Sequence, residues 1–177
     1  MSGHNKWSKI KRQKGSTDAA KSKIFGKMGA LIASESKRAK GDTSSPSLRA
    51  AIEKAQEYNM PKDTIDRAVK KGLGADAESM DSITYEAYGP GGSALIIEAL
   101  TSNRNKAAQE IKHILSKNGF ELASQGSASW AFTKGLGAEW APNMTVPLTP
   151  EDENILEILI NDLEENDEVQ DVYTNAE

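Results

Sequence analysis

The sequence predicts an α+β protein in two parts, a basic helical part followed by an acidic part that mixes strands and helices. Apolar residues recur at helical spacing through the first 72 residues, and β-rich segments with two helical ones follow from residue 83. The charge changes sign at the same place. Up to Lys71 there are 17 Lys and Arg against 7 Asp and Glu, and from Gly72 onward there are 5 against 19.

Three amphipathic helices with short links are expected in the first part, which makes a small bundle. The first begins after the candidate caps Ser16 and Thr17 and ends at Gly41. The second follows a polar loop and covers residues 48–58. The third has Pro61 at its first position and Gly72 just past its end.

The second part is expected to contain strands at 83–88, 93–100, 129–132, 143–148 and 169–173. Helices are expected after Asn103, ending at Gly119, and after Thr149. The order β-β-α-β-β-α-β predicts a ferredoxin-like domain, with one antiparallel sheet and helices on one face. The predicted domains are therefore 1–72 (basic arm plus helical bundle), a linker at 73–82, and 83–177 (acidic α+β domain).

Composition excludes several classes of protein. No apolar run reaches the roughly 20 residues of a membrane span, and no apolar segment follows the basic N-terminus as in a secretory signal. The chain has no cysteine, which removes disulfides and thiolate metal sites and fits the cytoplasm. The mitochondrial matrix is the alternative location, for a chain whose transit peptide has been removed. No cofactor, metal or small-molecule substrate is expected.

Local positive charge predicts that DNA or RNA binds the first part, because electrostatic fields act locally even when the whole chain is acidic. Residues 1–15 form a basic arm, in which Trp7 could stack on an unpaired base or dock onto the bundle. The cations of the helices could instead simply be solvated, or they could be stabilised by the helix dipole where they lie near the C-terminal end of a helix. The candidate nucleic-acid-binding residues are Lys6, Trp7, Lys9, Lys11, Arg12, Lys14, Lys21, Lys23, Lys27, Arg67, Lys70 and Lys71.

A second set of residues is a candidate contact for a partner or a phosphate. Its glycines lie in a run that lacks the Gly-Lys-Ser/Thr ending of a nucleotide loop, so a hairpin turn is the simpler interpretation. Its polar residues open a helix, where an anion can bind but where simple capping is the alternative. The set comprises Gly89, Gly91, Gly92, Asn103, Arg104, Lys106, Lys112 and His113.

Catalysis is not expected. The acidic run Glu151-Asp152-Glu153 and the acids at 164–168 fit a charged helix face, although a metal-dependent hydrolase or nuclease would also use carboxylates. After Lys134 there is no Lys or Arg against 12 acids, so phosphate should be repelled there. A further alternative is an adaptor whose basic half binds an acidic protein.

Several ordered segments resemble the YebC/PmpR family. They are residues 3–11 (GHNKWSKIK), 23–25 (KIF), 59–63 (NMPKD), 88–92 (YGPGG), 111–119 (IKHILSKNG) and 169–177 (VQDVYTNAE). The resemblance implies a cytoplasmic nucleic-acid-binding regulator. Relatives are named as transcriptional regulators and include the mitochondrial translational activator of cytochrome c oxidase subunit I. It also implies action linked to the ribosome on difficult coding stretches, proline-rich ones among them.

The chain departs from the family at one place. The family usually has three domains, the third inserted within the second. Here the resemblance breaks after Phe132 and resumes near Asn143, so a short linker at 133–142 is expected where the inserted domain would be. The remaining segments can still close one β-β-α-β-β-α-β domain.

Overall fold

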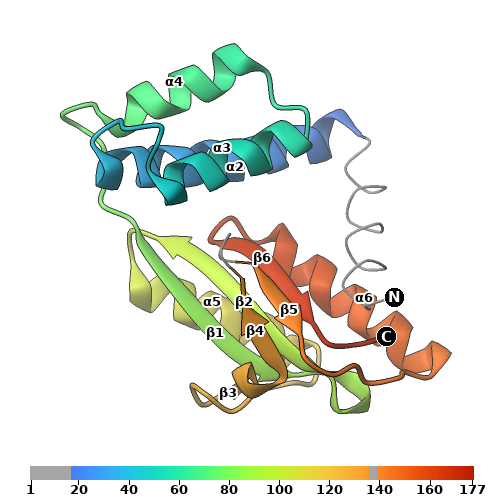
Figure 1. Ribbon diagram of the computed structural model, residues 1–177. Helices are drawn as coiled ribbons and strands as arrows, with labels where there is room; N and C mark the ends of the chain where they lie inside the picture. The colour runs from blue at the N-terminus through green and yellow to red at the C-terminus, as the bar shows by residue number, and fades with distance from the viewer. Residues whose placement is uncertain (1–16, 136–138) are drawn as a thin grey trace. The chain divides into compact units, whose positions relative to one another are not determined.

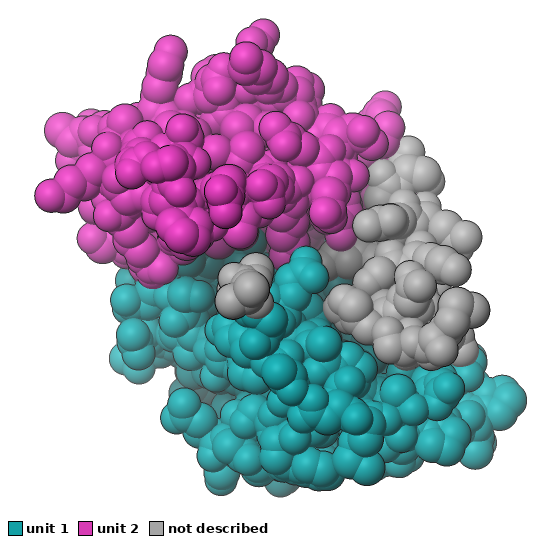
Figure 2. Space-filling model, in the orientation of Figure 1, with its two compact units in different colours: residues 1–11, 81–177 teal, residues 12–80 magenta. Residues whose placement is uncertain are grey.

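The computed structural model describes residues 17–135 and 139–177, which belong to two compact units (Figure 1, Figure 2). Residues 17–80 form a helical unit, and residues 81–177, apart from 136–138, form an α+β unit. The α+β class predicted from the sequence is confirmed. No helix in the described ranges is long and apolar enough to cross a membrane.

The helical unit contains α2 (Asp18–Ala39), α3 (Pro46–Glu57) and α4 (Lys62–Gly72) (Figure 1). The Thr17 hydroxyl caps α2 by accepting from the Ala20 N–H, as predicted. Pro61 precedes α4 as its cap, and Gly72 is the last residue of that helix rather than the residue after it. The buried core comprises Met28, Ile32, Leu48, Ala51, Ala55, Met60, Ile65 and Ala68.

Close approach of α2 and α4 depends on small residues. A methyl group on Gly72 would overlap the backbone carbonyl of Ala33, and the buried Ser36 hydroxyl donates to the Val69 carbonyl at 2.8 Å.

The C-terminal end of α2 also forms hydrogen bonds with residues 77–80. The Lys37 ammonium donates to the Ala77 carbonyl at 2.6 Å, and Arg38 donates to the Met80 carbonyl at 3.3 Å.

The α+β unit contains a four-stranded antiparallel sheet in the order β3-β1-β2-β6 (Figure 1). Its elements are β1 (Asp81–Tyr88), the 3₁₀ turn η1 (Pro90–Gly92), β2 (Ala94–Thr101), α5 (Arg104–Lys117), β3 (Leu122–Ala123), the 3₁₀ turn η2 (Ser129–Ala131), β4 (Phe132–Lys134), β5 (Trp140–Pro142), α6 (Pro150–Glu165) and β6 (Val169–Thr174). The side chains of Asn103 and Thr149 cap α5 and α6, as predicted.

Alternation along β2 divides the core between the two faces of the sheet. Leu95 and Ile97 are in a buried cluster with residues of α5 and α6, such as Ile111 and Leu159. Ala94 and Ile96, together with Phe132, Tyr173, Ala128 and Ala131, form a second cluster beneath η2 and β4. Both helices therefore cover one face of the sheet, as expected, and η2 with β4 and β5 covers the other.

The central part of this unit differs from the prediction. Residues 129–131 form η2, so the strand expected at 129–132 begins only at its end. The expected linker at 133–142 contains most of a two-stranded antiparallel pairing in which Lys134 lies opposite Trp140. The strand expected at 143–148 is reduced to a single bridge between Val146 and Ala176, because Pro147 has no N–H to continue a ladder.

Candidate nucleic-acid interface

The exposed side of α4 gathers three of the predicted cations. Arg67, Lys70 and Lys71 lie three to four residues apart on the helix, which places them on one face, and all three are exposed. The Arg67 guanidinium lies along its own helix, donating to the Thr64 hydroxyl at 3.2 Å and to the Asp63 carbonyl at 3.3 Å. Three cations therefore share the last two turns of α4.

A groove of about 430 Å³ runs between α3 and α4 beside these cations. Apolar side chains from Ile52, Ile65 and Val69 line it. Its charged groups are the ammonium groups of Lys62 and Lys70 and the carboxylate of Asp66. In the part of the chain that the structure describes, neither Lys70 nor Lys62 forms an ion pair.

The three lysines predicted on α2 do not form one patch. Lys23 and Lys27 are four residues apart and share a side of the helix, where both are half-buried and engaged by neighbouring groups. Lys21 is exposed, but its spacing of two residues from Lys23 places it on a different side. The six candidate residues of the arm lie outside the described residues: Lys6, Trp7, Lys9, Lys11, Arg12 and Lys14.

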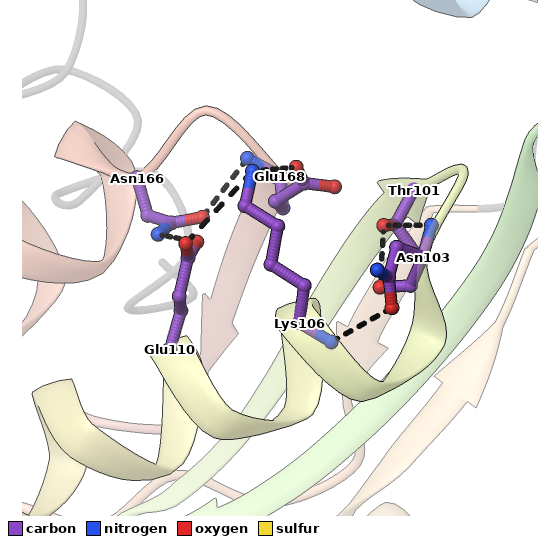
Figure 3. A network of polar contacts seen from close by, with 6 residues as sticks. All are labelled: Thr101, Asn103, Lys106, Glu110, Asn166 and Glu168. Carbon is purple, nitrogen blue, oxygen red and sulfur yellow. Dashed lines mark hydrogen bonds and ion pairs between the residues drawn. The ribbon is translucent and has the colours of Figure 1, made fainter.

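The second predicted set falls on the α+β unit, where its polar residues already have partners. The Asn103 side chain accepts from the Lys106 N–H at 3.0 Å, which is the capping alternative. Figure 3 shows the Lys106 ammonium reaching Glu168, at 2.9 Å, with Glu110 and Asn166 close by. Burial raises the pKa of Glu168, but contacts with Thr101 and Lys106 outweigh it and lower the pKa below its usual value.

Ion pairing extends to most other cations of this unit. Arg104 meets Asp81 at 2.8 Å, Lys117 meets Asp162 at 3.4 Å, and Lys134 meets Glu98 at 3.8 Å. The hydrogen bond and charge of Asp81 raise the pKa of Arg104 further above its usual value. Lys112 and His113 are exposed on α5 and form no ion pair within the described ranges.

The glycine-rich turn is explained by packing within the unit. Gly91 has φ +65°, and a methyl group there would come within 2.6 Å of the Leu148 side chain. A methyl group on Gly89 would come within 2.9 Å of the Ser93 hydroxyl, whereas Gly92, with φ +75°, has open space around it. The turn is therefore shaped to lie against the segment that leads into α6.

The carboxylate clusters provide no candidate metal centre. Among the described residues, no group of three or more His, Asp or Glu side chains is arranged to hold a metal ion. Asp152, in the first turn of α6, accepts from the Thr149 hydroxyl at 3.0 Å and belongs to the cap of that helix.

Sequence reasoning missed two features. The first is Lys62, which is not among the candidates predicted from the sequence. Lys62, Asp66 and Lys70 follow one another at intervals of four residues, and this spacing predicts that they lie along one edge of α4. The second is the loop that joins β3 to η2. There the buried carboxylate of Glu86 binds three backbone N–H groups beneath the exposed Trp130, and no local sequence pattern predicts that contact.

Comparison with known families agrees with this two-part organisation. The TACO1/YebC protein N-terminal domain matches residues 5–75, and the TACO1/YebC second and third domain matches residues 80–138 and 135–176. The chain belongs to the TACO1/YebC family. The resemblance inferred from the sequence is therefore confirmed.

Relatives in this family carry the name "Probable transcriptional regulatory protein". One from Petrotoga mobilis is 44% identical over 187 residues, covering all of this chain and 71% of the relative. One from Thermosipho africanus is 38% identical over 238 aligned positions, covering all of this chain and 94% of the relative. One from Fervidobacterium nodosum is 53% identical over 137 residues, 76% of this chain and about half (54%) of the relative.

A solved structure has the same fold. The crystal structure of a conserved hypothetical protein from Aquifex aeolicus superimposes with a TM-score of 0.76 at 28% identity, covering 90% of this chain and 91% of the other. The names of the sequence relatives indicate a regulator of gene expression.

Proposed function

We propose that this chain is a non-enzymatic, cytoplasmic regulator of gene expression that binds DNA or RNA through its helical unit and the basic arm before it. The observation that supports this most is the exposed face of α4, where Lys70 and Lys71 follow Arg67 by three and four residues and form no ion pairs among the described residues. Unpaired ammonium groups on one face can replace the counterions of a phosphate backbone.

The experiment reverses three positive charges on α4 and, as a control, three on α5, and compares the nucleic-acid affinity of the two variants. The triple variant Arg67→Glu, Lys70→Glu, Lys71→Glu should lower nucleic-acid affinity and reduce the log–log salt slope by about 3, close to 1 per lost phosphate contact. The matched variant Arg104→Glu, Lys112→Glu, Lys117→Glu makes the same charge change on α5 and should leave the slope unchanged. Equal losses in both variants would show that net charge, and not α4, controls binding.

The arm is tested separately. Replacing Lys9, Lys11, Arg12 and Lys14 with Glu should weaken binding and reduce the log–log salt slope by about 3 to 4, because each lost phosphate contact contributes roughly 0.7 to 0.9. Unchanged affinity would remove the arm from the proposal.

Transcription and translation are distinguished by the target. A ribosome-associated translational activator should co-sediment with ribosomes in a gradient, and a transcriptional regulator should shift duplex DNA at the same physiological salt. Binding to neither would contradict the proposed function. Complexes with an acidic protein that survive nuclease treatment would favour the adaptor alternative.

The β4–β5 pairing supports a proposal for the family's inserted domain. The two matches to the second and third domain overlap at residues 135–138, between β4 and β5. The Thermosipho alignment spans 238 positions although this chain has 177 residues. We therefore propose that the residues between β4 and β5 stand where longer relatives carry additional sequence.

A further inference from the structure

Two aromatic side chains are exposed next to each other on the α+β unit, on the side of the sheet opposite to α5 and α6. Trp130 in η2 is 59% exposed, and Tyr88 at the end of β1 is 38% exposed. Their contact is direct, because the Trp130 indole N–H donates to the Tyr88 hydroxyl at 3.1 Å. An exposed tryptophan in a fixed position requires an explanation, since burial of its ring would be favourable.

The loop that carries Trp130 is held from beneath by one carboxylate. Glu86, 4% exposed, accepts from the N–H groups of Gly126 at 2.7 Å, Ala128 at 2.7 Å and Ser129 at 2.8 Å. Burial raises the pKa of Glu86, but these hydrogen bonds outweigh it and lower the pKa below its usual value. The charge is therefore retained within the fold and orders the backbone on which Trp130 stands.

The polar edge of the indole is already in use. Its N–H also donates to the Ser127 carbonyl at 2.8 Å, and the Tyr88 hydroxyl donates to the same carbonyl. The Trp130 backbone carbonyl accepts from the Asn143 side chain at 3.3 Å. The exposed remainder of the ring is carbon, so it offers a π surface and no hydrogen-bonding group to a ligand.

The loop around Trp130 carries no acidic residue. No Asp or Glu lies in 122–135, and the residues that hydrogen-bond with Trp130 are Tyr88, Ser127 and Asn143. The carboxylate directly beneath the loop, Glu86, is buried and fully engaged. A base that stacks on Trp130 therefore meets no carboxylate among the residues that hydrogen-bond with this side chain or its backbone.

We propose that Trp130, supported by Tyr88, stacks on an unpaired base of a single-stranded nucleic acid. A π surface without hydrogen-bonding groups accepts any base, so the contact adds affinity without selecting a sequence. It adds no phosphate contact, because Trp130 brings no cation. This inference rests on the proposed function and adds to it a second contact, in the α+β unit, that is specific for unpaired bases.

The test measures binding of the full chain to a single-stranded oligonucleotide and to a duplex of the same sequence at several salt concentrations. Trp130→Ala should weaken single-strand binding about 5- to 150-fold, the range given by loss of one stacked base. The salt slope and the duplex affinity should not change. Trp130→Phe keeps an aromatic ring and should recover most of the affinity. Ile158→Ala on α6, where Ile158 is 54% exposed, is the matched control and should bind as the wild type does.

A second readout does not depend on the alanine variant folding. In protein labelled with 5-fluorotryptophan, the resonance that disappears in Trp130→Phe belongs to Trp130, and it should shift when the single strand is added but not when the duplex is added. No binding by the wild-type chain would overturn both this inference and the proposed function. Three results would overturn this inference alone. They are unchanged affinity of Trp130→Ala when the wild-type chain binds, equal losses of affinity for the single strand and the duplex, and a Trp130 resonance that responds only to a peptide.

Discussion

The cations on α4 and the cations of the α+β unit differ in how many carboxylates they meet. Residues 17–80 contain 12 Lys and Arg against nine acids, and residues 81–177 contain five against 17. Four of the five cations in the α+β unit form ion pairs with its own carboxylates: Arg104, Lys106, Lys117 and Lys134. On α4, by contrast, Lys62, Lys70 and Lys71 form none among the described residues.

The difference teaches that availability, more than the number of charges, decides where a phosphate can bind. Lys106 has the same ammonium group as Lys70, but a phosphate at Lys106 would have to displace Glu168. It would also bring negative charge close to Glu110. Most cations of the α+β unit are therefore committed to its own carboxylates, and the proposed contact there uses different chemistry, the exposed ring of Trp130.

The largest expected effects test whether the two units are separate folding units. Ile32→Ala and Leu159→Ala each leave a cavity at a fully buried position, the first in the core of the helical unit and the second in the core of the α+β unit. Each should lower the free energy of unfolding by about 2–5 kcal/mol. Hydrogen exchange should accelerate across residues 17–80 in the first variant and across 81–177 in the second. Faster exchange across both ranges in either variant would contradict the division.

The next effect concerns the buried carboxylate of the α+β unit. Glu86→Gln should cost about 1–3 kcal/mol at neutral pH, because an amide NH₂ replaces an oxygen that receives backbone N–H groups. Since hydrogen bonds lower the folded pKa of Glu86, its contribution is present above the unfolded value of about 4.3 and is lost as the pH falls through the folded pKa.

Urea unfolding of this variant and the wild type over a range of pH measures that contribution. The two stabilities should converge in acid. The stability of Glu121→Gln, changed at an exposed position in the same unit, should vary with pH in the same way as that of the wild type. A constant difference between Glu86→Gln and the wild type at all pH values would show that shape, and not charge, is lost.

In the helical unit, two glycines give effects of opposite sign. Gly72→Ala should cost about 1–3 kcal/mol, because the added methyl group overlaps the Ala33 carbonyl and forces α2 and α4 apart. Gly26→Ala, on the open side of α2 with nothing within 4 Å, should stabilise the unit by about 0.5–1 kcal/mol through helix propensity. Thermal unfolding measures both. Equal shifts in one direction would mean that propensity dominates at Gly72 as well.

Much of the fold could be predicted because it depends on local sequence. Thr17, Asn103 and Thr149 all cap helices at the predicted places, since a cap and the first turn lie within three residues of each other. The β4 and β5 strands could not be predicted, because three residues each carry too little alternation. They are specified instead by contacts across the sheet, among them the edge-to-face packing of Phe132 on Trp140.

The candidate site could likewise be predicted only where it depends on residues close together in the sequence. The spacing of Arg67, Lys70 and Lys71 places them together, because neighbours on a helix are three or four residues apart. The partner of Lys106 is 62 residues away in the sequence, and Glu86 binds N–H groups about 40 residues further on. Such distant contacts decide which cations remain available, and they depend on the tertiary fold.

The smallest expected effect tests the claim that cations of the α+β unit serve its own structure. The hydrogen bond and charge of Glu168 raise the pKa of Lys106, so the pair is ionised at neutral pH. Lys106→Met should lower the unfolding midpoint slightly at low salt and not at 1 M salt, because exposed ion pairs are weak and screened. Lys112→Met, which breaks no ion pair among the described residues, should leave the midpoint unchanged at both. Nucleic-acid affinity should be the same in both variants, and a loss confined to Lys106→Met would show that Lys106 leaves Glu168 to meet a phosphate.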